Sequence, residues 1–262
     1  MKQWFAPILL FALLILLLRQ PSARPAPASA ARVHLTVSAA ISLKESLESI
    51  RTIYQQQHAG VEVMLNLWAS GLLQRQIEEG APVDVFVAAS RTEMDELLQK
   101  GLLAAGTERD LLSNRLVLIC PASNCRITGF ASLTAPAVRR IAIANPESVP
   151  AGRYARQTLQ HLHLWQTIRP KVVLAGDVRQ ALADVETGNA AAGLVYSTEA
   201  RLSPRVRRVA DAPADSHQPI VYPVAIIRRS ANAAAAKRFV DFMFGPQARA
   251  AFERQGFVMA NP

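Results

Sequence analysis

Hydrophobic positions along this chain follow two alternating periods. Residues 33–38 carry apolar and β-branched side chains with a period of two, which predicts a strand. The next segment, 42–58, places Leu47, Ile50 and Tyr54 at helical spacing, which predicts a helix. The same alternation continues to the end of the chain. Further strands are predicted at 61–67, 84–88, 115–119, 140–144, 171–174, 192–196 and 220–227, and further helices at 72–79, 93–100, 151–164, 177–187, 233–244 and 246–255.

This alternation predicts the fold class. It indicates an α/β protein whose sheets are mixed but mostly parallel, with helices on both faces. The strands at 115–119 and 222–227 flank the middle of the chain, and we predict that each crosses between two lobes. Under this interpretation, 31–114 together with 222–262 forms the first lobe, and 115–221 forms the second.

The first 30 residues differ from the rest of the chain and predict a secretory signal peptide, 1–30. Lys2 supplies a short positive region, and 4–18 is an apolar stretch of 15 residues. A membrane-spanning helix needs roughly 20. The Ala-Ser-Ala at 28–30 fits the small-residue rule for cleavage. An uncleaved membrane anchor is the alternative. Because no Cys directly follows the apolar stretch, a lipid-attached form is not expected.

The charge of the chain is consistent with a basic, soluble surface. The formal charge is +9, and removing the predicted leader, which holds Lys2, Arg19 and Arg24, lowers it to about +6. The remaining positive residues are scattered, apart from three arginines within 205–208. No basic stripe with interleaved aromatic residues is present, so no nucleic-acid partner is expected. Such a surface attracts small anions at long range.

The two cysteines of the chain lie close together. Cys120 and Cys125 stand in the sequence Cys-Pro-Ala-Ser-Asn-Cys, directly after a predicted strand. In an exported protein such a pair predicts a local disulfide. The partners that a zinc site needs are missing nearby.

Histidine and nucleophile patterns predict neither a metal site nor a catalytic site. His161 and His163 are two residues apart on a predicted helix and therefore point apart, while His34, His58 and His217 are isolated. The sequence has no Gly-x-Ser-x-Gly elbow, no phosphate-cradling glycine loop and no dinucleotide fingerprint. We therefore predict a binding protein and not an enzyme, with no metal held directly by protein side chains.

The candidate site lies where predicted helices begin. Ser42, Ser70, Ala151 and Val178 each stand at or beside a helix start that follows the carboxyl end of a strand, and Tyr196 ends a strand. Open α/β sheets bind ligands at these ends, and helix starts present free N–H groups to anions. Each residue also has a plain structural role open to it: the serines as N-caps, Val178 as an ordinary helix-start residue and Tyr196 as a core tyrosine.

A dianion suits such a set of uncharged donors. Burying an unpaired charge costs many kcal/mol, but a hydrogen bond to a charged group contributes about 1.5–3 kcal/mol net. Six or seven converging donors are therefore enough for binding below 1 μM, which needs about 8 kcal/mol before association costs.

Several motifs, taken together, resemble one family. The chain is similar, over nearly all of the predicted mature part and in order, to the periplasmic molybdate-binding proteins of ABC transporters. The Val-Pro-Ala-Gly and Asp-Val-Arg segments are the most specific. The matching segments are Ser-Ala-Ala-Ile-Ser-Leu (38–43), Trp-Ala-Ser-Gly (68–71), Gln-Ile-Glu-Glu-Gly-Ala-Pro-Val-Asp-Val-Phe (76–86), Asn-Pro-Glu-Ser-Val-Pro-Ala-Gly-Arg-Tyr-Ala (145–155), Asp-Val-Arg-Gln-Ala-Leu (177–182), Gly-Leu-Val-Tyr (193–196) and Tyr-Pro-Val-Ala (222–225).

The resemblance implies a fold and a ligand. The fold is the two-lobed periplasmic-binding-protein fold of type II, with the ligand in the cleft between the lobes. The ligand is molybdate or tungstate, held by hydrogen bonds alone. The hydroxyls of Ser42, Ser70 and Tyr196 and the backbone N–H groups of Ser42, Ala151 and Val178 are implied as donors, with the N–H of Ser70 as a further candidate. The resemblance also implies delivery to a membrane permease of an ABC transporter. We further expect a monomer in the periplasm with no resident cofactor.

Three departures from the family pattern and three alternatives remain. Ser38 stands where the family can have an aromatic residue, Gly71 stands where it can have a further Ser, and the Cys120–Cys125 loop is not associated with the family. The ligand can instead be sulfate or another tetrahedral oxyanion. A phosphate carrier usually offers an acceptor for the ligand's proton, and Asp177 is the nearest carboxylate in sequence. A secreted hydrolase with Ser42 or Ser70 as nucleophile is a second alternative, and a sensor that signals to a partner is a third.

Overall fold

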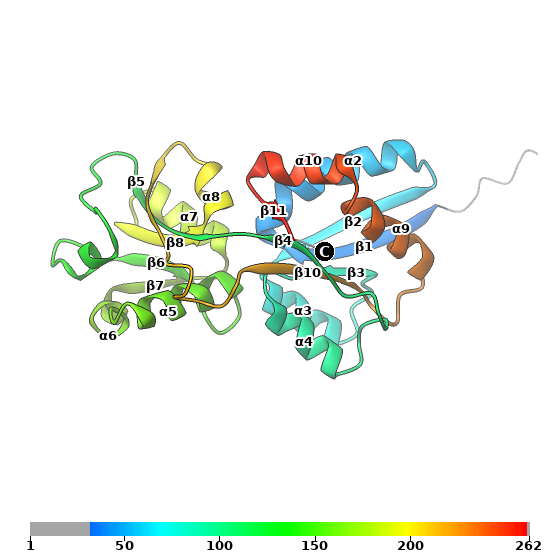
Figure 1. The fold of residues 1–262 in the computed structure, drawn as a ribbon, viewed down its shortest axis with the longest axis horizontal. Helices are drawn as coiled ribbons and strands as arrows, with labels where there is room; N and C mark the ends of the chain where they lie inside the picture. Colours follow the sequence, from blue (N-terminus) through cyan, green and yellow to red (C-terminus); the bar gives the residue numbers. More distant parts are fainter. Residues whose placement is uncertain (1–31, 261–262) are drawn as a thin grey trace, which may run out of the picture. The chain divides into compact units, whose positions relative to one another are not determined.

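The computed structural model describes residues 32–260. The predicted signal peptide, 1–30, lies outside the described residues. Within 32–260, no helix combines the length and the apolar character that crossing a bilayer requires. Two sheets and their flanking helices make up this part of the chain (Figure 1).

The first sheet has six strands in the order β11-β4-β10-β3-β1-β2. Strand β1 pairs in parallel with β2 and with β3, whereas β10 runs antiparallel to both β3 and β4, and β11 antiparallel to β4. The parallel strands β1, β2 and β3 follow one another in the sequence and alternate with helices, whereas β10 comes from much later in the chain. The bounds are β1 Val33–Ala40, β2 Val61–Trp68, β3 Val85–Val87, β4 Arg109–Ser113, β10 Val221–Ile226 and β11 Val258–Met259.

The second sheet has five strands in the order β7-β6-β8-β5-β9. Here β6 pairs in parallel with β7 and β8, and β5 pairs antiparallel with β8 and β9. The bounds are β5 Leu116–Pro121, β6 Ile141–Ala144, β7 Val172–Ala175, β8 Ala192–Tyr196 and β9 Val206–Asp211.

Helices cover both sheets. On the first sheet, α2 and α10 pack together on one side, and α3 packs with α4 on the other (Figure 1). On the second sheet, α5 and α7 pack on β6 and β8, and α8 packs beside β5 and β8. The helices are α2 Lys44–Gln57, α3 Ser70–Glu78, α4 Arg91–Gln99, α5 Pro150–His161, α6 Trp165–Ile168, α7 Val178–Glu186, α8 Ser197–Arg201, α9 Ala233–Met243 and α10 Pro246–Gln255, with 3-10 turns η1 Ile41–Leu43, η2 Phe130–Thr134 and η3 Arg169–Lys171.

Strand β3 packs against an apolar core on each face of the first sheet. Its residues are all buried, and successive side chains point to opposite faces. Val85 and Val87 belong to the large apolar core, whereas Phe86 belongs to the smaller core beneath α3 and α4. β10 divides in the same way, since Val224 joins the large core and Ala225 the smaller one. Both faces of these strands are therefore apolar, which is typical of a sheet covered on both sides.

The prediction of mixed α/β sheets with flanking helices is confirmed, but the expectation that their pairings are mostly parallel is wrong. Within 32–260, four strand pairings are parallel and five are antiparallel. The antiparallel pairings come from β10 and β5, and from three strands that the hydrophobic pattern did not predict: β4, β9 and β11. β9 contains two exposed arginines and lies at a sheet edge, and β11 has only two residues. The predicted lobe boundaries are not tested by these pairings and stay a prediction.

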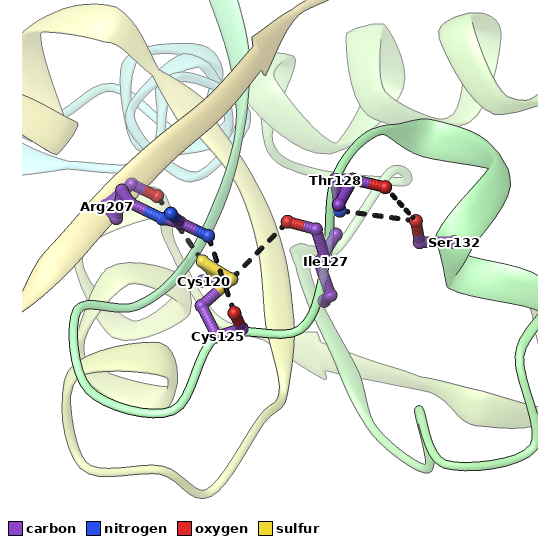
Figure 2. Close-up of a disulfide and its surroundings, with 6 residues drawn as sticks. All are labelled: Cys120, Cys125, Ile127, Thr128, Ser132 and Arg207. Carbon is purple, nitrogen blue, oxygen red and sulfur yellow. Dashed lines mark hydrogen bonds between the residues drawn. A yellow bond between two sulfur atoms is a disulfide. The ribbon is translucent and has the colours of Figure 1, made fainter.

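A disulfide joins Cys120, in β5, to Cys125, with their Cα atoms 5.8 Å apart. The bond closes a short loop at the end of the strand (Figure 2). The guanidinium of Arg207, on the neighbouring strand β9, donates to the carbonyl oxygen of Cys125 at 3.5 Å. The loop is therefore attached to the edge of the second sheet, at the opposite end of β5 from Leu116, which pairs with the candidate residue Tyr196.

At Gly152, helix α5 packs very closely on the end of β6, and this contact leads to a prediction about stability. A Cβ at Gly152 would lie 2.0 Å from the carbonyl oxygen of Ala144. We expect Gly152→Ala to lower the free energy of unfolding by about 2–3 kcal/mol, because backbone must move to admit the methyl group. Urea denaturation measures this. The matched control is Gly60→Ala, where a Cβ meets nothing within 4 Å. Equal stability of the two variants would contradict the prediction.

Candidate functional site

All five predicted ligand positions are buried, and they come from both sheets. The exposed fraction is 5% for Ser42, 1% for Ser70, 0% for Ala151 and 2% for both Val178 and Tyr196. Ser42 lies in η1 after β1, and Ser70 begins α3 after β2. The other three follow or end β6, β7 and β8 of the second sheet. Each position is therefore at the carboxyl end of a strand, as the sequence predicted.

Tyr222 lies between Ser42 and Tyr196. Its hydroxyl is 3.1 Å from Ser42 Oγ, and its ring centroid is 5.9 Å from that of Tyr196. Asn114 Nδ2 donates to Tyr222 Oη at 3.3 Å. With its oxygen accepting from Asn114, Tyr222 can donate its own proton to Ser42 Oγ. The hydroxyl proton of Ser42 then remains free to donate to a further group.

Ser70 is held in the same way by a backbone donor. The N–H of Ala89 donates to Ser70 Oγ at 3.0 Å. A serine oxygen that accepts one hydrogen bond keeps its proton for another. The carbonyl of Ala89 in turn accepts from Tyr154 Oη at 3.3 Å, and Tyr154 lies in α5, one turn after Ala151. Ala89 thus connects Ser70 to the helix that begins at the candidate donor Ala151.

Tyr196 has a buried hydroxyl with no hydrogen-bond partner among the described residues. An unpaired buried hydroxyl costs roughly 1–3 kcal/mol, which makes it unusual in a folded protein. Burial raises the pKa of Tyr196 well above its ordinary value of 10. The group therefore keeps its proton, and it is a donor that lacks an acceptor. Helix α5 packs on β8, the strand that ends at Tyr196.

The helix starts at Ala151 and Val178 supply backbone donors. The first N–H groups of any helix have no partner within the helix. Pro150 is the first residue of α5, and its ring has no N–H, so the N–H of Ala151 is the first that α5 offers. In α7, the Asp177 carboxylate accepts from the N–H of Gln180 at 2.9 Å, which leaves the N–H of Val178 uncapped by this side chain.

Direct contacts bring the two sheets' helix starts together. The N–H of Gly71 donates to the carbonyl oxygen of Ser148 at 3.2 Å, and Ser148 lies three residues before Ala151. A Cβ at Gly71 would be 2.6 Å from that oxygen. The departure noted at Gly71 therefore has a physical consequence: only glycine lets the start of α3 approach this turn so closely. η1, which holds Ser42, packs on α7, which begins at Val178.

Two arginines near the donors are paired with carboxylates. Arg153 contacts Glu93, and Arg179 contacts both Glu45 and Glu199. Burial raises the pKa of Glu199 to about 8, although Arg179 Nε, 2.8 Å from Glu199 Oε2, favours the charged form. The cations beside the helix starts are thus largely offset by acids.

The surroundings of the serines bear on the hydrolase alternative. Among the described residues, Ser42 Oγ is bonded to Tyr222 and Ser70 Oγ to the N–H of Ala89. Neither partner is a histidine or carboxylate that can act as a base. No group of three or more His, Cys, Asp or Glu side chains within 32–260 is placed to hold a metal ion.

Sequence reasoning missed the residues that orient the donors. Tyr222 stood in one of the matched segments, but nothing marked it as the partner of Ser42, 180 positions away. Asn114 and Ala89 carried no signal at all, because each acts through hydrogen bonds to residues distant in sequence, which only the tertiary fold brings together.

Comparison with known proteins gives consistent matches. Residues 35–258 match the family model described as bacterial extracellular solute-binding protein. A molybdate-binding protein of Escherichia coli is 40% identical over 86% of this chain and 89% of its own. A putative ABC transporter substrate-binding lipoprotein of Bacillus subtilis is 39% identical over 86% of each chain.

Solved structures agree. The periplasmic molybdate-binding protein of Azotobacter vinelandii superposes with a TM-score of 0.78 at 28% identity, covering 87% of this chain and 100% of that one. The substrate-binding domain of a putative molybdenum ABC transporter from Clostridium difficile gives a TM-score of 0.70 at 39% identity, with the same coverage.

Glu199 generates a prediction about pH. Its pKa of about 8 in the folded protein exceeds the ordinary 4.5, so the folded chain holds a proton that the unfolded chain has released. This stabilisation is complete below about pH 4.5 and is lost as pH rises through 8. We expect the free energy of unfolding to fall between pH 5 and pH 9, by roughly a few kcal/mol.

The variant Glu199→Gln isolates this effect, because Gln stays neutral at every pH. Urea denaturation across the pH range should give a flatter profile for Glu199→Gln than for the wild type. Glu186→Gln, which changes another carboxylate on the second-sheet side, is the control and should keep the wild-type slope. Parallel profiles for the wild type and Glu199→Gln would contradict the assignment.

Proposed function

Because this chain belongs to the bacterial extracellular solute-binding proteins, we propose that it captures molybdate, and also tungstate, outside the cytoplasm and delivers it to an ABC-type uptake permease. Its relatives support this proposal, since the Escherichia coli protein at 40% identity is named a molybdate-binding protein. In this proposal the protein is a periplasmic monomer that binds and releases its ligand without catalysis and carries no resident cofactor.

One observation carries the proposal: the Tyr196 hydroxyl is buried, protonated and without an acceptor. An oxygen of a tetrahedral anion would be the acceptor that this hydroxyl lacks. Ser70 has a free proton as well, because its oxygen already accepts from the N–H of Ala89, and Ser42 keeps its proton for a ligand when Tyr222 donates to it. The amides of Ala151 and Val178 supply two further donors. At about 1.5–3 kcal/mol for each bond to a charged acceptor, these groups offset the loss of the ion's hydration.

Sulfate is the main alternative ligand. The sulfate-binding protein of Mycobacterium tuberculosis superposes with a TM-score of 0.76, but at 18% identity it shares only the fold. Phosphate is a further alternative, because Asp177, beside Val178, caps α7 through Oδ1 alone and its other oxygen can accept a ligand proton.

Isothermal titration calorimetry of the mature chain with molybdate, tungstate, sulfate and phosphate tests the proposal. We expect molybdate and tungstate to bind with sub-micromolar dissociation constants, and sulfate to bind at least 100-fold more weakly. Tighter binding of sulfate would replace the proposed ligand, and heat changes with none of the four would reject an oxyanion carrier.

Ser70→Ala tests the site in the same titration. Loss of one charge-assisted bond should weaken molybdate binding by roughly 10–100-fold. Ser132→Ala is the matched control, because Ser132 lies in η2 and its hydroxyl bonds to Thr128, away from the five ligand positions in the sequence. Thermal melting without ligand separates a loss of binding from a loss of fold. Unchanged affinity in a folded Ser70→Ala protein would remove Ser70 from the site.

A further inference from the structure

Two ion pairs join the first-sheet side of the molecule to the second-sheet side. Arg153, in α5, contacts Glu93, in α4, and donates to Ser90 Oγ at 3.1 Å. Arg179, in α7, forms a two-pronged contact with Glu45, in α2, in which Nη1 lies 2.8 Å from Oε1 and Nη2 contacts Oε2. Such parallel bonds fix direction as well as distance.

The position of each arginine in sequence matters. Arg153 is two residues after Ala151, and Arg179 directly follows Val178. Each guanidinium therefore belongs to the same helix turn as a proposed backbone donor. When it binds a carboxylate on the other side of the molecule, it holds that turn in place. Both proposed amide donors of the second-sheet side are positioned in this way.

These pairs are better shielded from solvent than most ion pairs of the described chain. The side chains of Arg153 and Glu93 are 21% and 2% exposed, and those of Arg179 and Glu45 are 25% and 32% exposed. By contrast, Arg249 and Glu253 are each 53% exposed. Shielded pairs lose less to solvent and salt screening, so they contribute more to holding two surfaces together than exposed pairs do.

The pairs also keep the arginines from acting as ligands. A free guanidinium beside the donors would attract any anion, whatever its shape. Glu93 and Glu45 form ion pairs with these guanidinium groups. The selectivity of the site then depends on neutral donors of fixed geometry.

We propose that Arg153–Glu93 and Arg179–Glu45 are positioning pairs that lock the helix starts of Ala151 and Val178 over the bound anion and so set its rate of release. The inference rests on the proposed function. A contact that exists only when the two sides are together favours that arrangement, and ligand affinity rises by the same factor. Removing one pair should therefore speed dissociation much more than it slows association.

The test uses Glu45→Gln and Glu93→Gln, which remove the charge and keep the shape. The matched control is Glu78→Gln. Glu78 pairs with Lys100 at 2.7 Å and is 24% exposed, but both partners lie on the first-sheet side. Stopped-flow kinetics and calorimetry with molybdate give the rates and the dissociation constant. Thermal melting without ligand checks the fold, and Glu45, which is more exposed than Glu93, carries the test if Glu93→Gln is unstable.

We expect each glutamine variant to raise the dissociation constant about 3- to 10-fold through a faster release rate, with ligand-free melting unchanged for Glu45→Gln. The double variant should show the product of the two effects, because the pairs share no residue. Glu78→Gln should behave like the wild type. Wild-type release rates in Glu45→Gln would overturn the positioning role while leaving the proposed function intact. A wild-type protein that binds no oxyanion would overturn the proposed function, and this inference with it.

Discussion

A hydroxyl whose oxygen already accepts a hydrogen bond keeps its own proton for a further acceptor, such as an anion in a buried site. The structure meets this condition at Ser42 through Tyr222 and at Ser70 through the N–H of Ala89. Asn114 begins the first of these chains by donating to Tyr222. Because each oxygen has a donor of its own, the protons are left for a ligand. Neutral groups then accept a doubly negative ion without the desolvation cost of a buried cation.

The two sheets place these donors. Parallel strands β1 and β2 end at η1 and α3, and β6, β7 and β8 end at α5, α7 and Tyr196, so both sheets offer carboxyl ends and helix starts. Short contacts such as that between Gly71 and Ser148 hold the helix starts near one another. Gly71 and Gly152 both allow such a close approach, because a Cβ at either position would collide with a backbone carbonyl oxygen.

The sequence predicted much of the fold but little of the network around the site. Strands such as β1 and helices such as α2 have strong periodicity, and their predicted ends differ from the observed ones by a few residues at most. β9 was not predicted because an edge strand needs no apolar alternation on its open side. β11 was not predicted because two residues are too few to show a period. The family resemblance, which the comparisons confirm, supplied the five ligand positions as expectations. It did not supply Glu45 as the partner of Arg179, 134 positions away, because such a pair depends on tertiary geometry alone.

A crystal structure of the protein with molybdate tests the central claim most directly. The account predicts that the ion lies between the two sheets. Its oxygens should be about 3 Å from the hydroxyls of Ser42, Ser70 and Tyr196 and from the backbone nitrogens of Ala151 and Val178. An ion bound by arginine side chains, or one bound away from Tyr196, would contradict it.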